Sequence, residues 1–202
     1  FVQECLHREG KIALEKAGAQ GGYIEPRQHG LVTSPIDATE GDALQFSPQS
    51  NFTIAYWYYL ESPNDCRDQC KFLTRRPPLT GDLDYSIESQ VIDHLERTVP
   101  QCLNDFAPLR QQGFDLIEKG KMRFEVTFAQ NDVGIYLDYP IQAENEGVEL
   151  VVDEYQSVIE IPFKHMYDYA TIITAAAEQH DFLEQHTLEL ISVYSGVNKE
   201  KL

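Results

Sequence analysis

The sequence predicts an α+β fold: an antiparallel β-meander of about four to five strands, covered by two to three helices. Two observations support this class. Apolar residues recur at helical spacing in three segments, and they alternate with polar residues over 113–163. The helical segments lie before and after the alternating region, so the strands follow one another along the chain, as is typical of α+β proteins. We therefore expect one domain over 1–202.

A first helix is expected within 1–22. Its apolar residues fall mostly on one stripe, with charged residues on the opposite side. Gly21 and Gly22 follow, and glycine beyond the last turn often ends a helix. The stripe consists of Val2, Cys5, Leu6, Ile12, Ala13 and Ala17.

A second helix is expected over 81–103, because apolar residues recur there at every fourth position. Thr80 or Asp82 could cap its start, since both side chains can accept a hydrogen bond from a free backbone N–H. Pro100 is expected to stop it, because proline lacks the N–H that continues a helix. The stripe consists of Leu83, Ile87, Val91, Leu95 and Val99.

Residues 23–80 are expected to be irregular and rich in proline. A β-favouring run at 52–60 predicts one strand or extended arm. An irregular region of this length should be pinned, functional or both. It contains four consecutive aromatic residues, Tyr56, Trp57, Tyr58 and Tyr59. We favour packing of alternate rings on the core, and the alternative is a binding patch for a protein or a glycan.

The strands of the meander are expected within 113–163, where one buried face alternates with a polar face. A third helix is expected over 164–186, because its apolar residues return to helical spacing. A short strand and a frayed tail are expected over 187–202. The turns between the strands fall at 118–120, 130–132 and 144–147.

Four cysteines suggest two disulfides, for which three connectivities are possible. We prefer Cys5–Cys102 together with Cys66–Cys70. The second pair is close in sequence in a polar stretch between prolines, and each member of the first pair flanks a predicted helix. Free buried thiols and a metal site remain alternatives, although the spacing of Cys66 and Cys70 does not match a zinc site.

The chain of 202 residues carries 16 Lys and Arg against 33 Asp and Glu, a formal net charge of −17. This balance argues against nucleic acid as a partner, because nucleic acid is bound by basic side chains that neutralise phosphates. It also argues against adhesion to an anionic membrane surface. We interpret the acidity either as an ordinary solvated surface or as adaptation to concentrated, halophilic conditions.

No motif of catalysis or cofactor binding is present in the sequence. The chain lacks a phosphate-binding glycine loop, a nucleophile elbow and a His-Glu-x-x-His zinc motif. We therefore assign no catalytic residue, no cofactor and no metal ligand. Asn51 begins an acceptor triplet for N-glycosylation, which is compatible with export.

These observations favour a non-enzymatic extracellular domain at the cell surface, serving attachment, interaction or assembly. The hypothesis depends on the missing catalytic motifs, the proposed disulfides and the aromatic-rich irregular region. The alternative is an extracellular hydrolase that uses paired carboxylates, which the many acidic residues could supply.

Several short motifs occur together in an order that resembles a group of uncharacterised, N-terminally membrane-anchored extracellular proteins of small-genome archaea of the DPANN type. The resemblance covers residues 2 to about 180. It implies export, an anchor upstream of Phe1 and a pair formed by Cys5 and Cys102, but no activity. Cys66 and Cys70 are not part of the pattern. The motifs are Val2-x-x-Cys5, Gln20-Gly21-Gly22-Tyr23-Ile24, Tyr56-Trp57-Tyr58-Tyr59, Pro100-x-Cys102-Leu103, Gly113-Phe114, Asp138-Tyr139-Pro140 and Ile159-Glu160-Ile161-Pro162.

Overall fold

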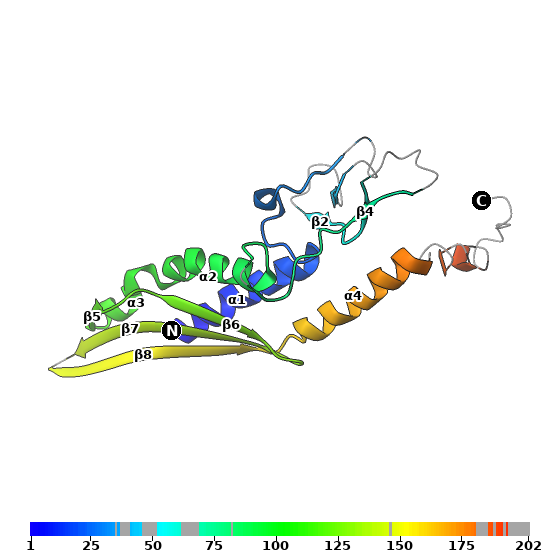
Figure 1. The fold of residues 1–202 in the computed structure, drawn as a ribbon. Coiled ribbons are helices and arrows are strands. Elements are labelled where there is room, and N and C mark those ends of the chain that lie inside the picture. Colours follow the sequence, from blue (N-terminus) through cyan, green and yellow to red (C-terminus); the bar gives the residue numbers. More distant parts are fainter. Residues whose placement is uncertain are drawn as a thin grey trace. The chain divides into compact units, whose positions relative to one another are not determined.

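The computed structural model confirms the α+β class, with helices and antiparallel sheets along the chain (Figure 1). The chain divides into two compact units, Phe1–Lys164 and His165–Leu202. This division does not test the expectation of one domain over 1–202, which stays a prediction. The structure describes residues 1–34, 36, 41–45, 52–61, 69–81, 83–145, 147–180, 186–187, 189–191 and 193.

The first unit is built around a four-stranded antiparallel sheet with one long central strand, β7 (Val133–Asn145). The strand β8 (Val148–Ile159) pairs along one edge of β7. On the opposite edge, β6 (Arg123–Phe128) pairs with the first half of β7, and β5 (Asp115–Glu118) pairs with the second half. The expected simple meander is therefore modified. Because β7 is longer than β6, β5 reaches β7 directly and lies end to end with β6.

Two helices, α1 (Val2–Ala19) and α2 (Ile87–Leu103), pack against each other and cover one face of this sheet (Figure 1). Alternate side chains of β7 point into the resulting core, as the period-two pattern predicts. Gly10 allows α1 to approach the sheet closely, because a Cβ atom there would collide with Ile135. The buried residues of β7 are Val133, Ile135, Leu137, Tyr139 and Ile141.

The helix α2 differs from its prediction at both ends. It begins at Ile87, and the Oγ atom of Ser86 accepts a hydrogen bond from the backbone N–H of Ser89 at 3.1 Å. Thr80 is therefore not the cap, and Asp82 lies outside the described residues. Pro100 lies inside the helix, which ends at Leu103. A proline so close to the end removes a single hydrogen bond of the last turns, so the helix continues past it.

The irregular region contains short strands instead of one. The strands β1 (Ala43–Gln45) and β2 (Thr53–Ala55) pair with each other, as do β3 (Tyr59–Leu60) and β4 (Phe72–Leu73). A 3-10 helix, η1 (Pro26–His29), precedes them. The expected strand over 52–60 is therefore divided into β2 and β3.

Two buried glutamines hold the start of this region. The Nε2 atom of Gln20 donates to the carbonyl groups of Tyr23 and Ile24, at 3.2 and 3.1 Å. The Nε2 atom of Gln90 donates to the carbonyl of Gly22 at 3.1 Å, and its Oε1 atom accepts from the N–H of Ile24 at 3.0 Å. Amide side chains can satisfy donors and acceptors at once, so they replace the ladder that a regular strand would supply.

The second unit contains most of the helix α4 (Phe163–His180). The side chains of Met166, Tyr169 and Ile172 on this helix are exposed. A short strand is expected in 187–202, but the described residues of this range, 187, 189–191 and 193, are helical, and the others lie outside the described residues. Among the described residues, no helix is both long enough and apolar enough to span a membrane.

Candidate functional site

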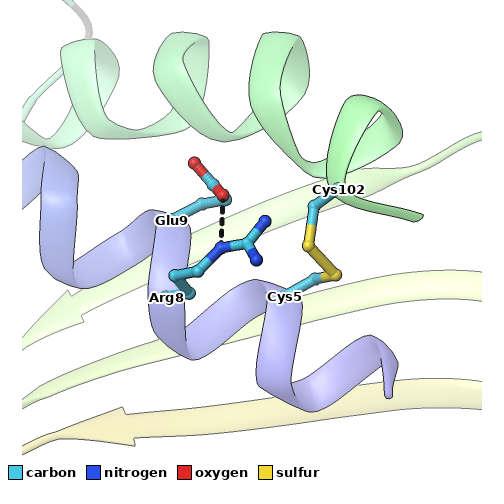
Figure 2. The surroundings of a disulfide bond; sticks show 4 residues. All are labelled: Cys5, Arg8, Glu9 and Cys102. Carbon is cyan, nitrogen blue, oxygen red and sulfur yellow. Dashed lines mark hydrogen bonds and ion pairs between the residues drawn. A yellow bond between two sulfur atoms is a disulfide. The ribbon is translucent and has the colours of Figure 1, made fainter. Parts of the chain in front are cut away.

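The disulfide between Cys5 and Cys102 is confirmed, and it joins α1 to α2 with a Cα–Cα distance of 5.8 Å. Figure 2 shows this bridge, together with the ion pair between Arg8 and Glu9 one turn further along α1. Cys66 lies outside the described residues, so its pairing with Cys70 stays a prediction.

The four aromatic residues Tyr56, Trp57, Tyr58 and Tyr59 are all half-buried. The indole Nε1 atom of Trp57 donates to the carbonyl of Gly21 at 2.8 Å, which ties the run to the end of α1. Burial raises the pKa of Tyr56. Their role as a binding patch stays a prediction, and Asn51 lies outside the described residues.

A pocket of about 410 Å³ lies between the C-terminal part of α2 and the connection from β5 to β6. We call it the α2 pocket. Its floor is apolar and aromatic, and Leu103, Phe106, Phe124 and Tyr139 are buried there. Pro100 and Met122 complete the apolar lining, and its polar lining consists of Glu96, Asp105, Glu118, Gly120 and Lys121.

A left-handed turn, Asn104–Phe106, forms one wall of the α2 pocket. Its three residues have φ angles of 47°, 51° and 54°. This conformation costs an L-residue roughly 1–2 kcal/mol, and Asn and Asp tolerate it better than Phe. Phe106 is nevertheless 2% exposed, and its ring stacks on that of Tyr139 at a centroid distance of 6.4 Å. Burial of this ring therefore offsets the strain, and the turn places Asp105 at the rim.

Arg110 fixes the far side of the left-handed turn. Its Nε atom donates to the carbonyl of Asp105 at 3.0 Å, and its Nη2 atom donates to the carbonyl of Leu116 in β5 at 3.0 Å. The disulfide at Cys102 holds the near side, because it ties the last turn of α2 to α1. The wall is thus held at both ends by contacts that do not involve a ligand.

The opposite wall depends on Gly120. A Cβ atom there would lie 2.7 Å from Cγ of Pro140, so only glycine fits without a shift of the neighbouring ring. The N–H of Lys119 donates to the carbonyl of Pro140 at 2.8 Å and holds the connection against β7. Pro140 stands at a bulge, where the pairing of β7 with β8 shifts between Asp138 and Ile141.

Charge is unevenly distributed around the α2 pocket. Three carboxylates, of Glu96, Asp105 and Glu118, line it together with one ammonium group, of Lys121. Burial, followed by a hydrogen bond with Glu118, raises the pKa of Tyr139. The pocket therefore offers an apolar interior with acceptors at its edge.

Sequence reasoning did not identify this pocket. The sequence pattern does not single out Glu96, and Pro100 was interpreted as the end of the predicted helix. The left-handed turn and Gly120 are distant in sequence, and both contact β7: Phe106 stacks on Tyr139, and Gly120 packs against Pro140. A local sequence motif therefore cannot reveal the pocket. The usable signal was the coincidence of Asn104 and Asp105 directly after a helix, since both residue types tolerate a positive φ.

Among the described residues, no group of three or more His, Cys, Asp or Glu side chains is arranged to hold a metal ion. In comparisons with known proteins, no family model matches this chain, and neither a curated protein nor a solved structure matches it.

Proposed function

We propose that this chain is a non-enzymatic, extracellular binding module of the cell surface, which holds part of its partner in the α2 pocket. The observation that carries the proposal is the pocket itself. Its volume of about 410 Å³ falls within the usual range of ligand sites, and its lining combines buried apolar side chains with a few polar groups. An interaction or attachment role requires no further chemistry.

The disulfide supports an extracellular location. Disulfides persist in oxidising compartments, whereas cytosolic thiols are kept reduced. Cys5 is buried, and its bridge to Cys102 connects two core helices. Attachment to the membrane would come from an anchor upstream of Phe1, as the resemblance to anchored archaeal proteins implies.

The setting of the carboxylates favours binding over hydrolysis. A hydrolase with paired carboxylates needs one acid in an apolar environment that keeps it protonated. The side chain of Asp105 is 81% exposed and lies 3.5 Å from the guanidinium of Arg110. Glu96 and Glu118 are also exposed. These carboxylates suit a charged rim better than a general acid.

A fragment screen by NMR tests the proposal on isotope-labelled protein. We expect amide shifts to concentrate around Asp105, Gly120 and Met122 when small apolar fragments with polar ends are added. Filling the pocket with Met122→Trp should abolish these shifts, whereas Thr127→Trp, on a strand but outside the pocket lining, should leave them intact.

Two results would overturn the proposed function. One is a screen in which no fragment perturbs the pocket. The other is hydrolysis of a glycoside, ester or peptide that is lost in Glu118→Gln, since this would indicate the carboxylate-based hydrolase.

A further inference from the structure

We infer that the α2 pocket selects an organic cation: an ammonium group carried on an apolar body, as in a free aromatic amine or a lysine side chain of a partner protein. This inference rests on the proposed function and names the ligand class of the same pocket. It combines the charge of the rim, the apolar floor and the rigidity of the walls.

The apolar floor of the pocket explains why we expect the ligand to have an apolar body. Leu103, Phe106 and Phe124 are buried and contribute to its lining, and the half-buried Met122 lies beside them. A thioether side chain is flexible and polarisable, so it can adapt to aromatic or alkyl groups. A volume of about 410 Å³ accommodates a phenyl ring with a short side chain, or the four methylenes of lysine.

The acidic rim explains why we expect the ligand to be positively charged. Its carboxylates come from three separate elements: Glu96 from α2, Asp105 from the left-handed turn and Glu118 from β5. Lys121 is the one basic residue of the lining. The guanidinium of Arg110, 3.5 Å from the carboxylate of Asp105, already offsets one of the three carboxylates. Glu96 and Glu118 therefore carry most of the attraction for a cation. A cation gains attraction from this arrangement, whereas an anion is repelled both by the rim and by the net charge of −17.

Glu118 is the acceptor that can hold the ammonium group. It lines the pocket beside Tyr139, and, after burial, a hydrogen bond with Glu118 raises the pKa of that phenol. A carboxylate has about four lone-pair sites, so Glu118 can accept from an ammonium group as well. Tyr139 therefore acts as a positioning residue that orients Glu118 at the pocket wall.

The walls exist before a ligand binds. The left-handed turn is held by Arg110 on one side and by the disulfide at Cys102 on the other. Binding to a preformed site avoids the cost of ordering loops, which otherwise consumes much of the interaction free energy. A small cation can therefore bind measurably, although each exposed ion pair contributes little.

The test compares three probes of similar shape and different charge by NMR titration: 2-phenylethylammonium, 2-phenylethanol and 3-phenylpropionate. We expect the ammonium probe to bind roughly 10-fold more tightly than the alcohol, with the carboxylate weakest. A second pair, Nα-acetyl-lysine methylamide and its norleucine counterpart, examines the side-chain source. Tight binding of the lysine probe would indicate a protein partner, and binding of the aromatic amine alone would indicate a free amine.

Variants locate the effect. Glu96→Gln and Glu118→Gln should each weaken binding of the ammonium probe about 3-fold and leave binding of the alcohol probe unchanged. Glu125→Gln is the matched control, because Glu125 is exposed on β6 and does not line the pocket. The preference for the cation should also decline as salt is raised from 0.05 to 0.5 M.

The outcomes separate the two proposals. Equal or tighter binding of the alcohol or carboxylate probe in the pocket would overturn the ligand class and leave the binding function intact. A cation preference that Glu125→Gln reduces as much as Glu118→Gln would also overturn it, because the charge of the whole chain would then be the cause. If no probe of any charge perturbs the pocket, the proposed function fails as well.

Discussion

Gly10 shows how a single residue sets the distance between a helix and a sheet. Glycine lowers helix propensity by about 1 kcal/mol relative to alanine, yet it stands in the middle of α1. The space explains its presence, since an added Cβ would collide with Ile135 and lie 2.8 Å from Cδ1 of Ile159. The lower helix propensity of glycine is therefore offset by the close packing of α1 against the sheet.

We predict that Gly10→Ala lowers the free energy of unfolding by about 1–3 kcal/mol, because overpacking outweighs the gain in helix propensity. Gly18→Ala is the matched control in the same helix. Its Cβ would meet Phe163 at an ordinary 3.9 Å, so this variant should be about 0.5–1 kcal/mol more stable. Urea denaturation measures both, and equal stability of the two variants would contradict the argument.

His94 is buried on α2, and its Nε2 atom has no hydrogen-bond partner among the described residues. Burial lowers its pKa, and Lys16 of α1 and Arg97 lower it further, against the opposing effect of Glu9 and Glu25. The folded protein thus binds a proton less readily than the unfolded chain, where histidine titrates near 6.5.

We predict that stability falls as the pH drops below about 6.5, because the unfolded state takes up the proton first. The slope due to His94 is at most about 1.4 kcal/mol per pH unit. Urea denaturation at pH 8, 7, 6 and 5 should show a smaller loss for His94→Leu than for the unchanged protein. Some loss should remain, since burial also lowers the pKa of His29. Identical pH profiles would exclude His94 as the cause.

At the scale of elements, the left-handed turn Asn104–Phe106 stores strain next to α2. We predict that Asp105→Gly raises the free energy of unfolding by about 0.5–1 kcal/mol, because glycine adopts a positive φ without cost. The same substitution in the helix, Asp93→Gly, should lower it by a similar amount. Opposite signs in thermal denaturation would confirm the strain, and destabilisation by both would refute it.

Periodicity predicted the regular elements well, because amphipathic patterns report which face is buried. The helix over 2–19 and the strands around β7 follow directly from it. Positions determined by tertiary contacts were not predictable. Two examples are the position of Pro100 within α2 and the pairing of β5 with β7 instead of β6. Both depend on contacts with segments that are distant in sequence.

The candidate site was less predictable than the fold. Its floor includes buried apolar residues such as Phe124, which lies in the segment predicted to alternate between a buried and a polar face. Its shape comes from Phe106 with a positive φ and from Gly120 against Pro140. Neither local sequence requires that geometry, so the pocket appears only when distant segments are brought together.

At the scale of the molecule, acidic residues from three neighbouring strands meet on the sheet face turned away from α1 and α2. Cross-strand neighbours there include Glu125 beside Tyr136, and Asp138 beside Glu154. The pKa of Tyr136 is raised to about 12, first by a hydrogen bond with Glu154 and further by the nearby charges of Asp138 and Glu125. Acidic side chains therefore lie close together on this face, and Arg123, the partner of Asp138 on β6, offsets part of their repulsion.

We predict that the free energy of unfolding rises between 0.05 and 1 M NaCl, because salt screens this repulsion. The triple variant Glu125→Gln, Asp138→Asn and Glu154→Gln should show a flatter dependence. Denaturant titrations at each salt concentration measure it. Stability that is constant or declines with salt would refute the prediction and would argue against adaptation to concentrated salt.

The packing of α1 against β8 has a consequence for biosynthesis. The ring Nδ1 atom of His7 lies 3.3 Å from the hydroxyl of Ser157, 150 positions later in the chain. At roughly 5–20 residues per second, a ribosome needs about 8–30 s to synthesise the intervening segment. During this interval the part of α1 that packs on β8 has no strand to cover it. The contacts between α1 and β8 can therefore form only after β8 has been synthesised, so the native core is completed late in translation or after it.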